Sequence, residues 1–376
     1  MKIGFDAKRL YSNYTGLGNY SRTIVKNLLD FYKEEDYHLY TTKINNSVES
    51  TFFQNHPRLK TRISQAKLKS YWRSYSIIDD LKTDQIDLFH GLSNEIPQSL
   101  KRSKIKSVVT IHDLIFKVLP ETYPYIDRKI YDLKFKSSCR NADKVIAISE
   151  NTKQDLIKYY QIPEDKIEVI YQCCNPIYYN QNIEADANKI LSKFNLPSEY
   201  LLFVGSIEKR KNLKLILDAF QKLKESDQIP LVIIGGGRSF NKELTDLISK
   251  QDFEKKLIWI KNLKDNEDLQ VVYQNAQALL YPSLYEGFGL PVVEALLSKT
   301  PVITSNNSSL PEAAGPNSLL INPKKSSELA HAISKVLNNS ELRAEMIEKG
   351  YQYAHNKFSA KTLTSQLYDC YKDLIK

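Results

Sequence analysis

Short runs of β-branched and aliphatic residues alternate with longer amphipathic segments along most of the chain. Runs such as LLFV at 201–204, LVII at 231–234 and VVTI at 108–111 are almost continuously apolar, as are the strands of parallel sheets that are covered on both faces. Segments with apolar residues at helical spacing follow them. This alternation predicts successive β-α units and an α/β protein.

The strands and helices expected from this pattern fall into two series. In the first we expect helices at 19–31 and 151–160 and strands at 2–5, 37–41, 86–90, 107–111, 144–148 and 166–170. In the second we expect strands at 200–204, 231–234, 257–260, 278–281, 301–304 and 318–321. Helices at 213–222, 267–275, 291–298 and 326–338 separate those strands. Two such series predict two Rossmann-like, doubly wound parallel-sheet domains.

A polar and irregular stretch separates the two series. It reads NPIYYNQNIEADANK at 175–189, and a new apolar run begins at Tyr200. We therefore expect a first domain at 1–185 and a second at 186–359. The helix expected at 360–376 would fold back across the first domain.

Composition places the chain among ordinary folded enzymes. Of its 376 residues, 42% are hydrophobic and 26% charged. No apolar run is long enough to span a bilayer. The first apolar run is interrupted at Asp6, so it lacks the core of a signal peptide. These features predict a cytoplasmic protein.

The formal net charge of +9 is concentrated in places. The stretch 58–73 holds six cations and no acid, with Tyr71 and Trp72 beside them; the cations are Arg58, Lys60, Arg62, Lys67, Lys69 and Arg73. This stretch is either a solvated face or a docking site for an anionic membrane surface or a lipid phosphate. No nucleic-acid-binding signature accompanies the charge, so we expect no nucleic-acid partner.

The segment YPSLYEGFGLPVVEALLS at 281–298 carries the strongest chemical signal. A strand ends near Tyr281, and Pro291 favours the start of a helix. The amides of Phe288, Gly289 and Leu290 would then point at an anion or a polar ligand.

Two carboxylates flank this predicted helix start, Glu286 and Glu294. A carboxylate accepts paired hydrogen bonds from vicinal hydroxyls, which favours a sugar or ribose diol as its partner. The alternative for Glu294 is an exposed position on the helix surface.

The string EGFGLPVVE resembles the E-x7-E signature of the retaining glycosyltransferases of family 4, which adopt the GT-B fold. Further segments resemble that family in the same order along the chain: GLGNYSRTIVKNL (16–28), VVTIHDL (108–114), VIAISENTKQDL (145–156), VGSIEKRKNLKLILDAF (204–220) and SLPEAAG (309–315). The resemblance spans nearly the whole chain. It implies two Rossmann-like domains facing a central cleft, with the donor bound by the second domain and the acceptor by the first.

The resemblance also implies roles for single residues. Lys211, with Arg210, would neutralise the donor diphosphate and the charge that grows on the leaving group. Glu286 would contact the donor sugar, and Glu294 the ribose of the nucleotide. The sequence departs from the family at Ser206, a donor-binding position where the family usually has arginine. Arg210 would then supply the missing charge.

The first domain would contribute the remaining positions. His112 would approach the transferred sugar, and a structural histidine is the alternative. Gly16 and Gly18 would let the backbone come close to the diphosphate. The pair lacks the third glycine of the dinucleotide fingerprint, which argues against NAD. The sequence shows no metal-binding cluster, so we expect neither a metal nor another cofactor.

The resemblance implies a nucleotide-sugar-dependent retaining hexosyltransferase. Its acceptor would be a glycan or a lipid-linked molecule in polysaccharide or lipopolysaccharide synthesis. Mannose from GDP-mannose is the first expectation for the donor, and UDP-glucose or a similar donor is the second. A GT-B sugar-nucleotide epimerase or phosphorylase, or a catalytically inactive binding subunit, remain alternatives.

Overall fold

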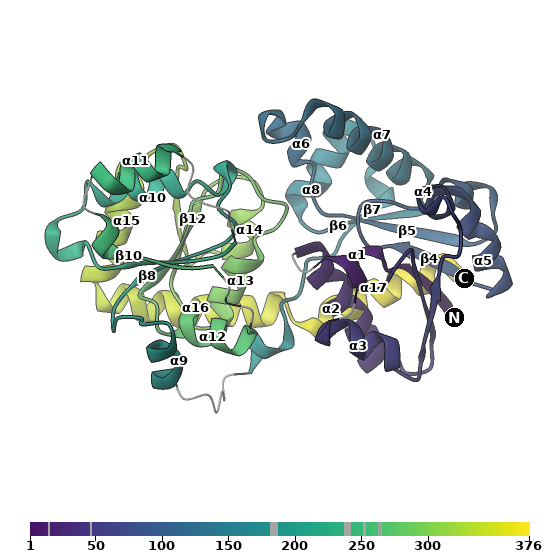
Figure 1. Ribbon diagram of the computed structural model, residues 1–376, viewed down its shortest axis with the longest axis horizontal. Coiled ribbons are helices and arrows are strands. Elements are labelled where there is room, and N and C mark those ends of the chain that lie inside the picture. Colours follow the sequence, from purple (N-terminus) through teal and green to yellow (C-terminus); the bar gives the residue numbers. More distant parts are fainter. Residues whose placement is uncertain are drawn as a thin grey trace. The chain divides into compact units, whose positions relative to one another are not determined.

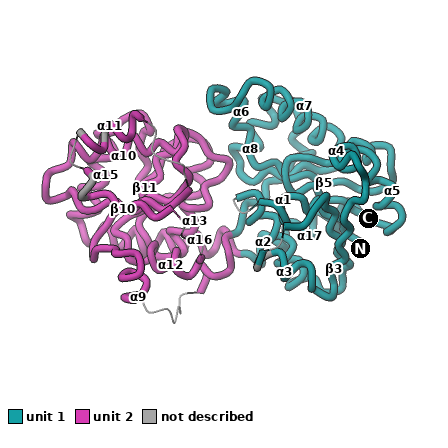
Figure 2. The backbone as a smooth tube through the Cα atoms, in the orientation of Figure 1, with its two compact units in different colours: residues 1–173, 360–376 teal, residues 174–359 magenta. Residues whose placement is uncertain are grey.

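The computed structural model describes residues 1–13, 16–45, 47–180, 187–236, 242–250, 253–261, 263 and 265–376 (Figure 1). The chain forms two compact units, coloured separately in Figure 2. Unit 1 comprises Met1–Cys173 and Ala360–Lys376, and unit 2 comprises Cys174–Ser359. Unit 2 thus begins earlier than the 186 expected from the sequence. The reason is local packing, since the ring of Tyr178 lies 6.1 Å from that of Tyr273 in unit 2.

Unit 1 is built on a seven-stranded parallel sheet of order β3-β2-β1-β4-β5-β6-β7. Strand order therefore reverses between the neighbours β1 and β4. The strands are β1 (Lys2–Asp6), β2 (Asp36–Thr41), β3 (Leu59–Ile63), β4 (Leu88–Gly91), β5 (Lys106–Ile111), β6 (Lys144–Ala147) and β7 (Ile167–Val169).

The helices of unit 1 connect these strands. They are α1 (Lys8–Ser12), α2 (Gly16–Phe31), α3 (Val48–Asn55), α4 (Lys69–Tyr71), α5 (Ile77–Thr83), α6 (Ile115–Val118), α7 (Tyr125–Asn141), α8 (Glu150–Asp155) and α17 (Ala360–Ile375). Helix α17 buries Leu363, Leu367 and Tyr371, which recur at helical spacing. The Tyr371 hydroxyl lies 2.5 Å from Nδ1 of His90 on β4, which ties the C-terminal helix to the sheet of unit 1.

Unit 2 contains a six-stranded parallel sheet of order β10-β9-β8-β11-β12-β13. Its strands are β8 (Leu201–Val204), β9 (Leu231–Ile234), β10 (Leu257–Ile260), β11 (Ala278–Tyr281), β12 (Val302–Ser305) and β13 (Leu319–Ile321). Its helices are α9 (Ala187–Lys193), α10 (Leu213–Phe220), α11 (Lys242–Lys250), α12 (Asn266–Gln274), α13 (Leu290–Leu297), α14 (Leu310–Ala314), α15 (Ser326–Asn338) and α16 (Ser340–Lys357). Every residue of β8, β9 and β11 is buried, which explains their continuous apolar runs.

Strand β3 was not expected from the sequence. It pairs in parallel with β2, from Tyr37 opposite Leu59 to Thr41 opposite Ile63, and it forms the edge of the sheet. Its sequence LKTRI carries two cations. Charged side chains are common on edge strands because they oppose pairing with other chains. These charged residues also interrupt the apolar run by which the other strands were recognised in the sequence.

Candidate functional site

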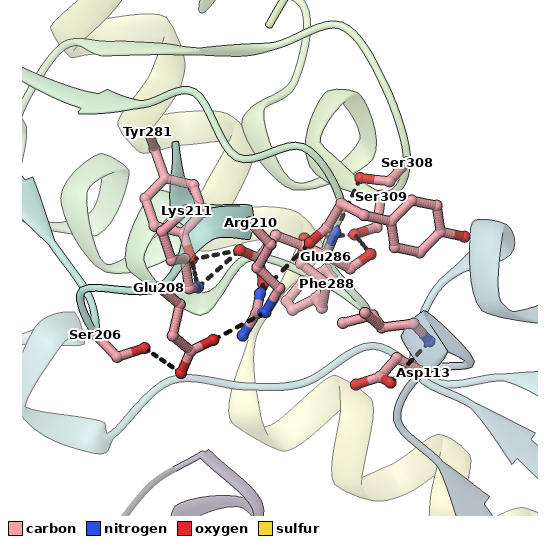
Figure 3. Close-up of polar contacts among 12 residues, drawn as sticks. Asp113, Ser206, Glu208, Arg210, Lys211, Tyr281, Glu286, Phe288, Ser308 and Ser309 are labelled. Atoms are coloured by element: carbon pink, nitrogen blue, oxygen red, sulfur yellow. Dashed lines mark hydrogen bonds and ion pairs between the residues drawn. The ribbon is translucent and has the colours of Figure 1, made fainter. Parts of the chain in front are cut away.

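The candidate site lies in unit 2, where strand order reverses between β8 and β11. In open α/β sheets the loops diverge at such a point and leave room for a ligand at the carboxyl ends of the strands. The loop after β8 leads through the 3₁₀ turn Lys209–Lys211, and the loop after β11 spans 282–289. Figure 3 shows the polar side chains that these loops bring together.

Local backbone contacts fix the two loops to each other. Asn212 follows the 3₁₀ turn in the left-handed region at φ 59°. Its side-chain amide donates to the carbonyls of Pro282 at 3.0 Å and Pro323 at 2.8 Å. The amide of Leu284 donates to the carbonyl of Arg210 at 2.7 Å. The cations of one loop are thereby held against the carboxylate of the other.

Glu286 is the centre of the charged cluster. Its Oε1 lies 2.7 Å from Nζ of Lys211, and its Oε2 lies 2.8 Å from Nη1 of Arg210. The Tyr281 hydroxyl donates to Oε1 at 3.2 Å, and Lys211 also donates to that hydroxyl. Both Glu286 and Lys211 are buried. The three charged residues were expected from the sequence, whereas Tyr281 was not, although its position at the end of the predicted strand was an available signal.

The charges of the cluster control one another's ionisation. Burial alone would raise the pKa of Glu286, but the adjacent Lys211 and Arg210 lower it to about 2. Burial lowers the pKa of Lys211, and the Glu286 carboxylate opposes that shift. Lys211 and Arg210 thus place two positive charges at this site, and an incoming anion would compete with the carboxylates for them.

Ser206 acts on the cluster through a second acid. Its hydroxyl donates to Oε1 of Glu208 at 2.7 Å, and Oε2 of Glu208 lies 3.2 Å from Nε of Arg210. Ser206 thus positions an acid that the sequence analysis had not selected. Arg210 is held from both sides, by Glu208 and by Glu286.

The start of α13 is shaped by Gly289 and Ser309. Gly289 has φ +115°, and a Cβ there would lie 2.9 Å from Cδ2 of Leu310. The Ser309 hydroxyl donates to the carbonyls of Glu286 at 3.0 Å and Phe288 at 2.8 Å. The helix begins at Leu290, one residue before the expected start, so Pro291 is its second residue and not its first. The first amides of a helix have no partner within it and favour an anion.

The side chain of Phe288 serves the core. Its ring packs edge-on against Phe358 at 5.3 Å between centroids. The binding role expected from the sequence concerns its backbone amide and not this ring.

Glu294 is half-buried on α13 and is not a freely solvated surface residue. Its Oε2 accepts a hydrogen bond from the Tyr273 hydroxyl at 3.1 Å. Burial raises the pKa of Glu294 to about 7, and the bond from Tyr273 opposes this shift. Glu294 is thus a carboxyl group that titrates near neutral pH. Tyr273 was not expected from the sequence, because it lies on a different helix, α12.

His112 belongs to unit 1, directly after β5, and both of its ring nitrogens are engaged. Nε2 lies 2.8 Å from the Leu92 carbonyl, and Nδ1 lies 3.0 Å from the amide nitrogen of Gln172. This pattern fits a ring that donates from Nε2 and accepts at Nδ1. Burial lowers the pKa of His112 to about 4. The ring is neutral at pH 7 and is not available as a general base.

Gly16 and Gly18 also belong to unit 1, and the structure gives them different constraints. Both lie within α2, which begins at Gly16. A Cβ on Gly18 would lie 1.8 Å from the carbonyl oxygen of Asn13, whereas one on Gly16 would meet nothing within 4 Å. The close approach that requires Gly18 is therefore to the chain's own backbone. Tyr14 and Thr15 lie outside the described residues.

Part of the basic stretch 58–73 is committed to internal contacts. Trp72 is only 5% exposed, and its Nε1 donates to Asp80 at 2.7 Å. In the docking alternative Trp72 would meet the membrane surface, and its burial rules this out. Arg62 pairs with Asp80 at 3.2 Å and with Asp84.

Arg73 lies at the corresponding reversal of strand order in unit 1, between β1 and β4. It pairs with Asp6 and, at 2.8 Å, with Glu95. Asp6, Arg73 and Glu95 line a small pocket there together with Lys8 and Trp72. Of the six cations in the stretch, Lys60, Lys67 and Lys69 are the exposed ones.

The described residues also bear on metals and membranes. Among the residues that the structure describes, no group of three or more His, Cys, Asp or Glu side chains is placed to hold a metal ion. Within the same residues, no helix combines the length and the apolar character needed to cross a membrane.

Family models match both halves of the chain. Residues 186–353 match the model described as Glycosyl transferases group 1, and residues 14–176 match Glycosyltransferase Family 4. O-antigen chain mannosyltransferase B of Escherichia coli is 27% identical, over 99% of this chain and 100% of that protein. O-antigen chain mannosyltransferase RfbU of Salmonella typhimurium is 29% identical, over 71% of this chain and 69% of that protein.

Solved structures show the same fold at low sequence identity. HepE from Anabaena, in complex with UDP and glucose, superposes with a TM-score of 0.78 at 18% identity, over 99% of this chain and 100% of that one. WaaG, a glycosyltransferase involved in lipopolysaccharide biosynthesis, gives 0.73 at 17% identity, over 98% and 99%. With two parallel-sheet, Rossmann-like units, the chain has the GT-B fold.

Proposed function

The chain belongs to the glycosyltransferases of family 4, and we propose that it moves a hexose from a nucleotide-sugar onto a glycan or lipid-linked acceptor with retention of anomeric configuration. GDP-mannose is the proposed donor because the E. coli and Salmonella relatives are O-antigen mannosyltransferases. UDP-glucose is the second candidate, since HepE has been solved with UDP and glucose. Lipopolysaccharide or surface polysaccharide synthesis is the proposed setting.

The observation that carries this proposal is the cluster of Arg210, Lys211 and Glu286 at the strand reversal of unit 2. The two cations would hold the donor diphosphate at a position where a parallel sheet binds ligands. Lys211 is buried and Arg210 is half-buried, so their charges act on the leaving phosphate with little screening by water. The Glu286 carboxylate accepts hydrogen bonds and would orient the hydroxyls of the donor sugar.

The transfer step needs no covalent enzyme intermediate in this scheme. The bond between the anomeric carbon and the diphosphate oxygen breaks, and the acceptor oxygen bonds to the same face of that carbon. The acceptor proton passes to the leaving phosphate oxygen. His112 is neutral and is hydrogen-bonded through both ring nitrogens, so it would not remove the proton.

Glu294 and the start of α13 would bind the rest of the donor. The ribose diol would donate to Glu294 in its ionised form. The backbone amides at Phe288, Gly289 and Leu290 would meet sugar or phosphate oxygens at the positive end of the helix. Ser206 would contribute by fixing Glu208 against Arg210, and Gly16 and Gly18 by shaping the first turn of α2.

We further propose that transfer requires no metal, because Arg210, Lys211 and the helix start supply the positive charge. A lipid-linked acceptor would place the enzyme at the cytoplasmic face of a membrane as a peripheral protein.

A donor panel tests the proposed function. The purified protein is incubated with GDP-mannose, UDP-glucose, UDP-galactose or UDP-N-acetylglucosamine and with lipid-linked oligosaccharides from a polysaccharide-producing bacterium. Mass spectrometry should show one added hexose with GDP-mannose, and NMR should show the anomeric configuration of the donor. Epimerised donor, or phosphate-dependent release of sugar phosphate, would instead support the epimerase or phosphorylase alternatives. Binding of a donor without any product would support the binding subunit.

A further inference from the structure

Helix α7 turns a stripe of large apolar side chains away from the core of unit 1. Ile126 is 70% exposed, Ile130 is 43% exposed and Leu133 is 73% exposed. Their spacing of four and three residues places them on one face of the helix. Tyr125, at the start of the helix, is 63% exposed beside them.

A different face of α7 holds the helix in the fold. Phe135 and Cys139 are buried in the core cluster of unit 1. The ring of Tyr131 stacks on that of Phe135 at 5.8 Å between centroids. The outward stripe therefore contributes little to folding, and its apolar character needs another explanation.

Cations border the stripe. Lys129 and Arg140 are exposed and Lys136 is partly exposed. Viewed down the helix axis, with a rotation of about 100° per residue, all three lie on one side of the stripe and within about 80° of Ile126. Lys129 also lies over the ring of Tyr125, with Nζ 5.5 Å from its centroid. The acid Asp132 is occupied by Lys117 at 2.7 Å. The positive border therefore lies on the side of Lys129, Lys136 and Arg140, and the opposite side carries Asp127 and Lys134.

The apolar and basic character continues on neighbouring segments. The 3₁₀ turn Gln98–Arg102 contacts α7 and ends in the exposed Lys101 and Arg102. The same turn joins the segment after α4, where the Tyr75 hydroxyl donates to Gln98 at 3.1 Å. Leu68, directly before α4, and Tyr71, its last residue, are also exposed. In Figure 1, α4 and α7 lie along the same border of unit 1.

We propose that the outward face of α7 docks unit 1 on an anionic lipid bilayer. A helix that carries Ile, Leu and Tyr between lysines and arginines fits the boundary between head groups and acyl chains. The apolar side chains would enter that boundary while the cations contact lipid phosphates. At 17 residues, α7 is long enough to lie along the surface for about 25 Å. A bilayer matches both features, the continuous apolar stripe and the positive border.

Docking through α7 does not depend on the identity of the donor or on catalysis. Vesicle binding can therefore fail while transfer to a detergent-solubilised acceptor persists, and the reverse also holds. The two proposals are separately testable.

Sedimentation with vesicles of phosphatidylglycerol and phosphatidylcholine tests the docking surface. The stripe variant is Ile126→Ser, Ile130→Ser and Leu133→Ser, and the border variant is Lys129→Gln, Lys136→Gln and Arg140→Gln. Matched controls replace the exposed Phe52 and Leu320 with Ser, or the exposed Lys222, Lys224 and Lys361 with Gln. Unfolding curves confirm that each variant is folded.

We expect the full-length protein to bind anionic vesicles and to release as salt rises. The stripe and border variants should each lose about tenfold or more in vesicle affinity, whereas the controls should match the parent. Equal binding by parent and stripe variant would overturn the proposal, and so would failure of the parent to bind at low salt. Either result would leave a protein partner as the occupant of this face.

A second readout does not depend on the triple variant. Leu133→Trp places an indole in the stripe, and its emission should shift to shorter wavelength on vesicles and be quenched by brominated lipids. The other tryptophans, Trp72 and Trp259, supply a background that the parent protein measures. An unchanged spectrum with vesicle-bound protein would show that α7 does not enter the bilayer.

Discussion

The ammonium group of Lys211 lies 2.7 Å from Oε1 of Glu286, although 75 residues separate the two in the chain. They meet because β8 and β11 are neighbours in the sheet while their connections run to opposite sides. The carboxylate keeps the two cations in place in the absence of an anion. The pair therefore links the stability of unit 2 to the charge that catalysis would use.

Replacing Lys211 separates these two effects. Lys211→Met should lower kcat by about 10²–10³, the range seen when a donor that stabilises transition-state charge is removed. It should also destabilise the fold, because Glu286 keeps only Arg210. Adding Glu286→Gln should recover stability without activity. Lys209→Met, at the exposed neighbouring lysine, is the control for both assays. Near-normal transfer by Lys211→Met would show that Lys211 has no role in the reaction.

Glu294 should make stability depend on pH. Its folded-state pKa of about 7 lies above the ordinary value of 4.5, so its stabilising contribution is present below pH 4.5 and is lost as pH rises to 7. The loss amounts to at most about 3 kcal/mol in the free energy of unfolding. Glu294→Gln should flatten the decline between these pH values in denaturant titrations. Parallel curves for parent and variant would contradict the raised pKa.

Donor affinity should follow the same ionisation. If ribose hydroxyls donate to the Glu294 carboxylate, affinity for GDP-mannose should rise as pH passes through about 7, because this donor has no terminal phosphate that titrates in the same range. The dependence should vanish in Glu294→Gln and persist in His112→Gln, because His112 stays neutral above its pKa of about 4. Calorimetric titrations from pH 5.5 to 8.5 measure this. If the pH dependence instead disappears in His112→Gln, the titrating group is His112 and not Glu294.

Arg73 should act through the fold of unit 1 and not through its surface charge. Arg73→Met leaves Asp6 and Glu95 without their shared cation and should cost about 3–5 kcal/mol in the free energy of unfolding. Lys69→Met, at an exposed lysine of the same stretch, should change it by no more than about 0.5 kcal/mol. Similar changes in the free energy of unfolding for the two substitutions would show that Arg73 is a solvated surface residue and not a structural one.

Chelation tests the source of positive charge at the donor. Transfer should continue in excess EDTA, because Arg210 and Lys211 are covalent parts of the chain. Complete loss of activity that Mg²⁺ or Mn²⁺ restores would show that a metal balances the diphosphate. The parent and Lys211→Met should be compared, since an added metal could partly replace the lysine.

The sequence was informative where a local pattern sets the structure. Continuous apolar runs predicted β8, β9 and β11, and the glycines and proline of 287–291 predicted the turn into α13. The contact between Lys211 and Glu286 is different, because only the order of strands brings the two loops together. The resemblance to a known family assigned both residues to the donor, but it did not predict that they contact each other.

Long-range ion pairs and unusual faces were hidden from the sequence. The partner of Arg73 is Asp6, 67 residues away, so a run of cations without a nearby acid looked solvated. Edge strand β3 was obscured by Lys60 and Arg62. Helix α7 was not expected from the sequence, because apolar residues occupy two of its faces and the usual pattern of one apolar and one polar face is missing.

The binding of GDP to the parent and to a variant with Arg210→Gln and Lys211→Met tests the central claim most directly. The claim is that these two cations hold the donor diphosphate at the strand reversal of unit 2. Calorimetry should show tighter binding of GDP than of GMP by the parent, and loss of that preference in a variant that remains folded. Equal affinity of parent and variant for GDP would contradict the proposed site.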